Sequence, residues 1–392
     1  MPAPRSTTFL ALALGVLCTL PTPARALTNA AKAAAPAVGP SAGLPGPAAA
    51  DPLVVDQAPD SDAPASPSPL RIGLATAASI VPGVLVHGSG AFVLGDKRTA
   101  LRLLAWEGTG LGMFLAGGIG LALTGASRRT VIPLSLLTMS GLGLFSLTWL
   151  ADIYGALSPV FQPGRPMLAL PDWELEFGYL GVAGGPFDAG TIAAFGVTAR
   201  PGAWRLHAAV DLALDADNQR FWAAATRRFV GPNASGSRFH DDSYLELELR
   251  GGLHNFGADG FTQTTGDVLA RGRRALVHTA SPLAGAFAEM GFGIGLETYH
   301  FEQGTDLNSR LLGEVAFGAN IGRGGPVRGE VMTFYDHRKD GYTGGLPLFG
   351  IAGHAGLRTR LYFAERWGLL AEVATGRSTT ARLSLLYVGG SS

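Results

Sequence analysis

The chain has 392 residues, of which 47% are hydrophobic and only 15% are charged, and its mean hydropathy is positive. Ordinary soluble domains carry roughly 25% charged residues, so a membrane protein is the first class to consider. The 30 basic and 30 acidic residues cancel, which excludes the sustained positive field that nucleic-acid binding requires.

Residues 1–26 have the three parts of a secretory signal peptide. Arg5 supplies the positive start, and an apolar run from Phe9 to Leu20 follows it. Ala24-Arg25-Ala26 offers small residues at the two positions that signal peptidase reads. We therefore expect cleavage after Ala26.

The single cysteine, Cys18, lies inside this segment. A lipid-modified cysteine is the alternative, but Leu17 stands where a lipobox has a small residue. The mature chain would then contain no thiol, which excludes disulfides, zinc–thiolate sites and cysteine nucleophiles. No cofactor and no metal are expected from the sequence.

Residues 27–69 are rich in Ala and Pro and contain no aromatic residue. Such a composition buries too little apolar area to offset the entropy lost on ordering. We expect a disordered linker that acts as a periplasmic spacer.

Residues 70–157 form an apolar helical segment. Two uncharged runs, Gly108–Ser127 and Thr130–Ala151, flank the basic pair Arg128-Arg129, a pattern that predicts a transmembrane hairpin. The alternative is a pair of helices buried against the barrel described below or inside it. The earlier run Ile72–Gly95 would be a third span, a re-entrant segment or an interfacial helix.

Small residues recur every fourth position in the first run, at Gly108, Gly112, Ala116 and Gly120. Small side chains on one helix face allow two helices to approach closely. This spacing predicts that the face packs against the second helix of the hairpin.

Two spans would return the chain to the periplasm and place Arg128-Arg129 in the cytoplasm, as the positive-inside tendency requires. An inner-membrane hairpin beside an outer-membrane barrel, however, would tether two membranes with very little intervening chain. Either the helices associate with the barrel in the outer membrane, or residues 172–392 are not a barrel.

Residues 158–171 are a Pro-punctuated connector, and from Asp172 the hydrophobic period becomes two. In one segment Leu245, Leu247 and Leu249 alternate with charged neighbours. About twelve such segments of about ten residues each, with aromatic residues near their ends, are typical of an antiparallel up-and-down transmembrane β-barrel. We expect residues 172–392 to form it; a soluble β-sandwich is the alternative.

Loop lengths also favour the barrel. Short connections are expected at 200–203, 279–283, 322–326 and 364–367, and longer ones at 184–190, 252–268, 300–306 and 337–347. Outer-membrane barrels have short periplasmic turns and long external loops. The connection at 231–242 breaks the alternation.

The run from Phe349 to Gly390 carries the sequence resemblance. It contains Gly350-Ile351-Ala352-Gly353, the strand Arg358–Phe363, the turn Glu365-Arg366-Trp367-Gly368 and the closing Ala381–Tyr387. It resembles the last three strands of bacterial outer-membrane β-barrel proteins as a general class. The resemblance implies contact with membrane lipid and assembly by the barrel-assembly machinery. Such proteins usually end on an aromatic residue, whereas here five residues follow Tyr387.

The faces opposite the apolar ones carry the candidate lumen-lining residues. They would line a selectivity filter, or the acids and arginines would pair across a narrow interior, which the mixed signs favour. The candidates are Glu174, Glu176, Arg205, His207, Asp211, Glu246, Glu248, Arg250, Glu289, Glu297, Arg310, Glu314, Arg328, Glu330, Arg358, Arg360, Glu372 and Arg382.

A hydrolase site is the one catalytic alternative. His240, Asp241 and Ser243 lie together in the irregular connection, but their spacing fits no triad, and His337 near a strand end reads as a loop or lumen residue. Gly291, Gly293 and Gly295 lack the helix that follows a phosphate-binding loop and are expected to relieve crowding on an inner face.

The sequence therefore predicts an outer-membrane barrel with a structural, surface-display or passive-transport role, and enzymatic activity is not favoured. An inner-membrane-anchored protein whose periplasmic β-domain binds a partner is the first alternative. A lipid-modifying enzyme of the outer membrane is the second. A small solute and an envelope partner are the remaining candidate ligands.

Overall fold

The structure is a computed structural model, in which the helices and the barrel belong to one compact unit, Ala65–Ser392. The predicted signal peptide, nearly all of the predicted linker and most of the predicted connector lie outside the described residues. The described residues are 67–125, 127, 129–161 (159–161 without side chains), 170–184, 190–232, 234, 241–257, 260–322, 327–338, 341–345 and 353–390.

The N-terminal part is helical. Its elements are α3 (Pro69–Ile80), η1 (Pro82–Val84), α4 (Ser89–Leu94), α5 (Lys97–Thr124) and α6 (Val131–Phe161). We call these elements together the helical unit. Glycines with positive φ, Gly88 and Gly95, bracket the short α4, and Asp96 caps α5 by accepting a hydrogen bond from the Thr99 N–H.

The run Ile72–Gly95 is not a third straight span. Its longest helix, α3, has 12 residues and is about 18 Å long, short of the roughly 30 Å hydrocarbon core of a bilayer. The chain breaks at Pro82, because Pro removes a helical hydrogen bond, and again at Gly95, whose left-handed conformation ends α4.

Helices α5 and α6 pack mainly through glycines that differ from the predicted ones. A Cβ atom at Gly110 would lie 2.8 Å from the Phe145 nitrogen, and one at Gly141 would lie 2.3 Å from the Phe114 nitrogen. Gly108 and Gly112 have no atom within 4 Å of such a Cβ. The predicted packing face was therefore wrong at Gly108 and Gly112, whereas Gly120 does pack against α6, where a Cβ atom would lie 2.9 Å from the Leu134 side chain.

The face of α5 that meets α6 has a seven-residue spacing. Leu103, Gly110 and Gly117 are buried at this spacing, and a Cβ atom at Gly117 would lie 2.7 Å from the Thr138 nitrogen. A seven-residue repeat stays on one side of a nearly straight helix pair, whereas the four-residue repeat at 108–120 drifts away from it.

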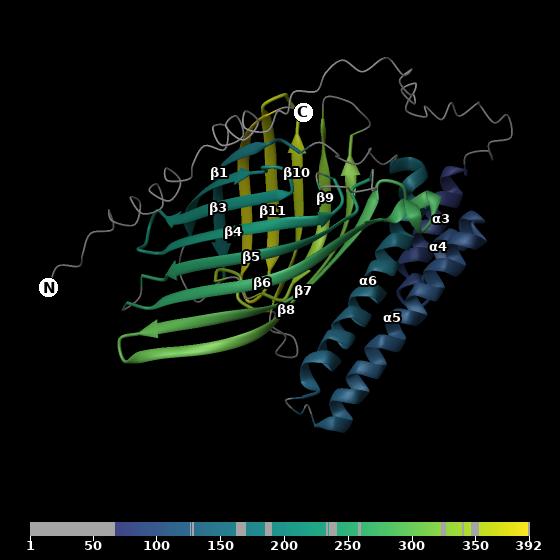
Figure 1. Cartoon of the computed structure of the whole chain (residues 1–392). Helices are drawn as coiled ribbons and strands as arrows, with labels where there is room; N and C mark the ends of the chain where they lie inside the picture. Colours follow the sequence, from purple (N-terminus) through teal and green to yellow (C-terminus); the bar gives the residue numbers. More distant parts are fainter. Residues whose placement is uncertain are drawn as a thin grey trace, which may run out of the picture. The chain divides into compact units, whose positions relative to one another are not determined.

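The remaining chain forms a closed barrel of twelve antiparallel strands, each hydrogen-bonded to its neighbours in sequence, with β12 pairing with β1 (Figure 1). This confirms the predicted up-and-down barrel. The strands are β1 (Trp173–Ala183), β2 (Thr191–Ala199), β3 (Trp204–Ala213), β4 (Gln219–Val230), β5 (Tyr244–Asn255), β6 (Thr262–Ala275), β7 (Ala286–Phe301), β8 (Gly304–Ile321), β9 (Arg328–Asp336), β10 (His354–Tyr362), β11 (Trp367–Thr375) and β12 (Thr379–Gly389).

The expected division into short and long connections holds only in part: 200–203 and 322–327 are short and 337–353 is long, but other connections differ. We call the end of the barrel at which β1 begins and β12 ends the terminal end, and the opposite end the distal end. At the terminal end, residues 231–243 and 276–285 make long connections, whereas at the distal end residues 302–303 make a tight hairpin between β7 and β8. Strand β8 already begins at Gly304, although residues 304–309 show no apolar alternation, so the expected loop at 300–306 placed the start of this strand too late.

The outer face of the barrel is apolar. Large hydrophobic side chains on this face are exposed, for example Phe177 at 50%, Leu249 at 51% and Leu383 at 56%. Near the terminal end Trp173 and Trp367 both contact Tyr387, with ring centroids 5.5 and 4.9 Å apart. Aromatic rings in this position are typical of the membrane–water interface.

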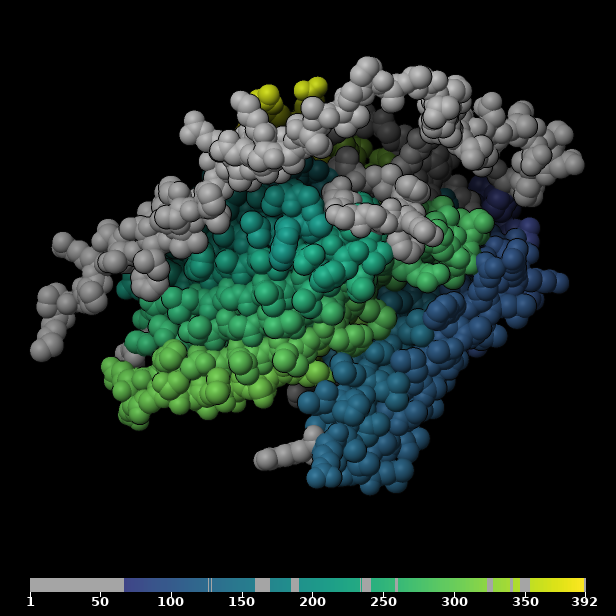
Figure 2. All heavy atoms as spheres, viewed as in Figure 1, coloured from purple at the N-terminus to yellow at the C-terminus, as the bar shows by residue number. Residues whose placement is uncertain are grey.

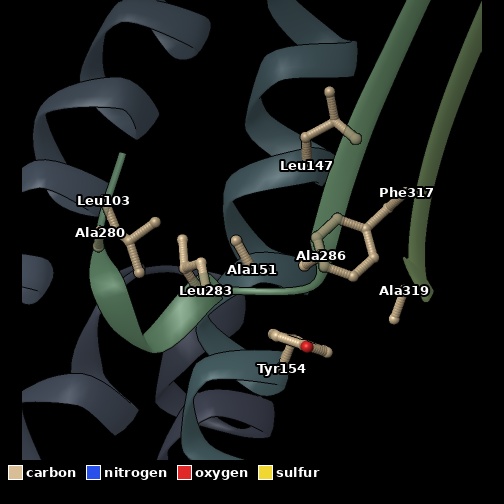
Figure 3. Packing of buried hydrophobic residues seen from close by; sticks show 9 residues of the cluster. All are labelled: Leu103, Leu147, Ala151, Tyr154, Ala280, Leu283, Ala286, Phe317 and Ala319. Carbon is tan, nitrogen blue, oxygen red and sulfur yellow. The ribbon is translucent and has the colours of Figure 1, made fainter. Parts of the chain in front are cut away.

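Helix α6 packs on the outer face of β7 and β8. Leu147, Ala151 and Tyr154 of α6 share a buried cluster with Leu283 and Phe317 (Figure 3). The Tyr154 hydroxyl also donates a hydrogen bond of 2.8 Å to the Ala284 carbonyl. Of the two arrangements considered, the helices therefore contact the barrel from outside.

Glycines let the two surfaces approach. A Cβ atom at Gly313 of β8 would lie 2.1 Å from the Met139 Cε, and one at Gly143 of α6 would lie 2.8 Å from Val315. Figure 2 shows the helical unit, in blue, in contact with the green surface that includes β7, β8 and the 276–285 connection.

Candidate functional site: the barrel lumen

The interior of the barrel holds a cavity of about 390 Å³. Among the described residues that line it are twelve arginines and nine carboxylates. Its lining reaches from Arg200 and Pro232 at the terminal end to Gly341 and Thr343 at the distal end. The interior is therefore polar and charged along its length, while the outer face is apolar.

One centre of the charge network is Glu246 on β5, which is 2% exposed. Its carboxylate accepts hydrogen bonds from Arg205 at 2.9 Å, Arg271 at 3.1 Å and Arg228 at 3.4 Å. Three guanidinium groups from β3, β4 and β6 thus meet at one acid. A buried carboxylate is stable only when such partners compensate its lost hydration.

A second centre links β6, β8 and the end of β9. Arg271 donates two hydrogen bonds to Glu314, at 2.7 and 2.9 Å. Arg338 binds Asp336 with a bond of 2.8 Å from its Nε and reaches Glu248 at 3.2 Å. The Arg338–Asp336 pair is local, but Arg271–Glu314 and Arg338–Glu248 join elements that are not neighbours in the sheet.

The seam between β1 and β12 is also held by charge. Asp211, which is fully buried, accepts hydrogen bonds from Arg220 at 2.6 Å and from Arg382 at 2.7 Å. Glu174 accepts one from the Tyr362 hydroxyl at 2.7 Å and lies 3.2 Å from Arg360.

The structure brings most predicted lumen residues together around the cavity. Those lining it are Glu176, Arg205, His207, Glu248, Arg250, Glu289, Arg310, Glu314, Glu330, Arg358, Arg360, Glu372 and Arg382. Glu174, Asp211, Glu246 and Glu297 lie behind them, each bound by at least one arginine. Arg328 is different: it is exposed at the start of β9, outside the cavity lining.

Several lumen residues were missed by the sequence analysis. Arg271 and Arg273 follow the two-residue period of β6 and could have been found by extending that strand. Arg273 bridges Glu289 and Glu330, the latter at 2.9 Å. Arg338 follows the last residue of β9, where no period applies, and only the tertiary structure reveals its role.

Residues 341–345 fold into the distal mouth of the barrel. Tyr342 is 4% exposed and Thr343 is 1% exposed. The Tyr342 hydroxyl donates to the Asn218 side chain at 3.2 Å, and the Thr343 carbonyl accepts from the Ser378 N–H at 3.0 Å. We call this segment the inserted loop; it belongs to the long connection expected at 337–347, and it narrows the distal opening.

The hydrolase alternative gains no geometric support. Asp241 pairs with His278 and accepts a hydrogen bond of 2.7 Å from the Ser243 N–H, while the Ser243 hydroxyl accepts from the Ala275 N–H. Burial raises the pKa of Asp241, but the hydrogen bonds from His278 and Ser243 outweigh it and hold that pKa below its usual range. His240 lies outside the described residues.

His337, the other candidate, binds the Tyr335 hydroxyl at 2.7 Å. Within the described part of the chain, no group of three or more His, Cys, Asp or Glu side chains has the arrangement of a metal site. Gly291 and Gly293 lie on β7, and a Cβ atom at Gly293 would meet the Val268 carbonyl at 2.0 Å, so glycine there prevents a clash with the neighbouring strand.

No protein-family model matches the chain, and no curated protein matches it. Solved structures are similar to the chain over about half of its length. A KdgM porin in complex with disordered oligogalacturonate is 11% identical over 55% of this chain and 99% of its own, with a TM-score of 0.34.

The translocator domain of the autotransporter NalP from Neisseria meningitidis is 14% identical over 56% of this chain and 89% of its own, with a TM-score of 0.35. The Acinetobacter baumannii outer membrane protein Omp33 is 9% identical over 56% of this chain and 98% of its own, with a TM-score of 0.28. Similarity at this level carries no argument about function, which has to be built from the residues of this barrel.

Proposed function

We propose that this chain is an integral outer-membrane β-barrel that lets small solutes pass through a narrow, charge-lined lumen. The inverted polarity of the barrel carries the proposal. Its outer face exposes many large apolar side chains, whereas twelve arginines and nine carboxylates among the described residues line its interior. In a soluble protein the exposed face would carry the charge, and only a surrounding apolar solvent makes the observed arrangement favourable.

The lumen supports passage of small solutes rather than free diffusion of large ones. The cavity of about 390 Å³ is lined by residues from both ends of the strands. Arginine–carboxylate pairs cross it, and the inserted loop narrows its distal end. A solute would therefore pass between fixed charges, in the manner of a selectivity lining.

A second role, anchoring of the helical unit, is favoured by the contact between α6 and β7–β8. Among the described helices, α6 is long and apolar enough to cross a membrane over Val131–Ser158, and 22% of its apolar window is buried in the protein. Most of that surface is free to contact lipid. Helix and barrel would then share one membrane, which removes the conflict of a chain tethered between two.

Membrane fractionation tests the location. We expect the protein in the outer-membrane fraction, contacting lipid there after insertion by the barrel-assembly machinery, with heat-modifiable migration in gels. Recovery with the inner membrane would instead favour the anchored periplasmic β-domain and contradict the proposal.

Conductance in planar bilayers tests the passage. We expect small single-channel steps from the wild type and larger ones from Tyr342→Ala, because that change removes the side chain that fills the distal mouth. Tyr179→Ala on the outer face of β1 is the matched control and should conduct as the wild type does. Equal conductance of the wild type and Tyr342→Ala would reject the inserted loop as the constriction.

A further inference from the structure

One lumen arginine stands apart from the others. Each of the remaining eleven arginines that line the cavity lies within 4.0 Å of a carboxylate oxygen. Arg250 on β5 has no such partner among the described residues and makes no hydrogen bond to any of them. Its guanidinium lies over the ring of Trp222, 4.2 Å from the ring centroid.

The carboxylates around Arg250 are already engaged. Asp267, its direct neighbour on β6, binds Arg310 at 3.2 Å. Glu248, two residues before it on the same strand, is bound by Arg338 at 3.2 Å and by Arg271 at 3.4 Å. Neither acid is free to neutralise Arg250.

Strand register places Arg250 and His207 on neighbouring parts of the lumen wall. Ala224 on β4 pairs with Arg250 on one side and with His207 of β3 on the other. The small Ala224 side chain lies between two long polar ones, and all three line the cavity. Arg250 and His207 therefore face the same part of the cavity, and the Trp222 ring contacts both of them.

His207 presents a second unsatisfied group. Its Nδ1 is hydrogen-bonded to the Thr198 hydroxyl at 2.8 Å, and its ring lies 4.3 Å from that of Trp222. Its Nε2 is buried and has no hydrogen-bond partner. When Nδ1 accepts from the Thr198 hydroxyl, Nε2 carries the proton and is a donor.

A guanidinium out of bulk water without a counter-charge is unfavourable, and the stacked indole compensates only part of that cost. We propose that Arg250, with His207 beside it, binds an oxyanion group, a carboxylate or a phosphate, of a small solute in the lumen. The planar guanidinium donates two parallel hydrogen bonds to such a group. This inference rests on the proposed lumen passage and names the class of solute that the passage would favour.

Trp222 provides the reporter for a test. The full-length protein in detergent micelles is titrated with sodium acetate and, separately, with sodium phosphate, while sodium chloride keeps the ionic strength constant. We expect a saturable change in tryptophan emission with at least one of the two oxyanions. Trp222→Phe should abolish this change, since the indole that contacts Arg250 is then absent.

Variants at Arg250 decide the assignment. Arg250→Gln should weaken oxyanion binding about tenfold or more, because hydrogen bonds to a charged group are lost. The oxyanion affinity of Arg250→Lys should lie between those of the wild type and Arg250→Gln, since lysine keeps the charge but not the planar pair of donors. Arg227→Gln is the matched control, because Arg227 is on the same sheet but faces outward, next to Trp204 and Phe229.

The two arms separate the ligand classes, with a response to acetate pointing to a carboxylate and one to phosphate pointing to a phosphate group. An Arg250→Gln protein that titrates like the wild type, or a wild type with no saturable response to either anion, overturns the inference. If the protein binds an oxyanion but shows no conductance in bilayers, the Arg250 site stands and the proposed passage of solutes is rejected. The failure of the site and the failure of the proposed function can therefore be told apart.

Discussion

The barrel interior and the helical unit both bury carboxylates, but they satisfy them with different donors. In the barrel, Glu246 is held by three arginine side chains. In the helical unit, Asp152 is fully buried and accepts hydrogen bonds from the backbone N–H groups of Gly90 and Ala91, both at 3.1 Å. Glu107 likewise accepts from the His87 N–H at 2.8 Å.

The difference follows from where each structure leaves backbone donors. Every strand of a closed barrel pairs on both edges, so its N–H groups are used by the ladder. The first turns of a helix leave N–H groups without a partner, and the breaks around α4 supply several. Charge in the barrel must therefore be neutralised by side chains, and charge in the helical unit need not be.

Among the substitutions considered, loss of a lumen carboxylate should lower the stability of the protein most. Glu246→Gln removes the buried carboxylate that Arg205, Arg228 and Arg271 share, and we expect a destabilisation of roughly 3–5 kcal/mol. The midpoint temperature of heat-modifiable gel migration measures it. Glu302→Gln at the exposed β7–β8 turn is the control and should leave the midpoint unchanged; equal midpoints for both variants would show that pairing does not stabilise the barrel.

A smaller effect, confined to the helical unit, is expected from Asp152→Asn. An amide replaces one acceptor oxygen with a donor that faces the N–H groups of Gly90 and Ala91, at a cost of roughly 1.5–3 kcal/mol. Limited proteolysis should cleave the helical unit faster while the barrel keeps its heat-modifiable migration. Loss of barrel folding in this variant would mean that the two regions are not separable.

The contact between α5 and α6 allows a matched pair of substitutions. Gly141→Val places a side chain against the backbone of Phe114 and Gly110, at 2.3 and 2.5 Å, which cannot move aside. We expect about 1–3 kcal/mol of destabilisation and faster proteolysis. Gly112→Val, which meets no atom within 4 Å, should be as stable as the wild type. If Gly112→Val were the more destabilising of the two substitutions, the helices would pack through the small-residue face that the sequence predicted.

The smallest effect should appear at the terminal rim of the barrel. Because the pKa of Asp241 lies below its ordinary value of 3.8, its stabilising contribution is present above that value and is lost as the pH falls through the folded-state pKa. Melting midpoints measured from pH 5 downward should fall slightly more for the wild type than for Asp241→Asn. Parallel curves for the two proteins would show that the contact with His278 contributes nothing.

Much of the barrel was predictable because strand period is a local property. Leu245, Leu247 and Leu249 alternate with Glu246, Glu248 and Arg250, and this alone separates the two faces of β5. The apolar runs likewise predicted long helices, since helix formation needs only contiguous residues. The sequence alone therefore predicted which charged residues of β5 face the interior of the barrel.

Which charges meet was decided only by the tertiary structure. Arg382 and Asp211 are 171 residues apart, and their contact depends on barrel closure, which no local pattern encodes. The same holds for Tyr342 in the distal mouth and for α6 on β7–β8. Period assigns a side chain to a face, but its partner depends on the register and curvature of the whole wall, and for that reason Arg250 became recognisable as unpaired only in the folded chain.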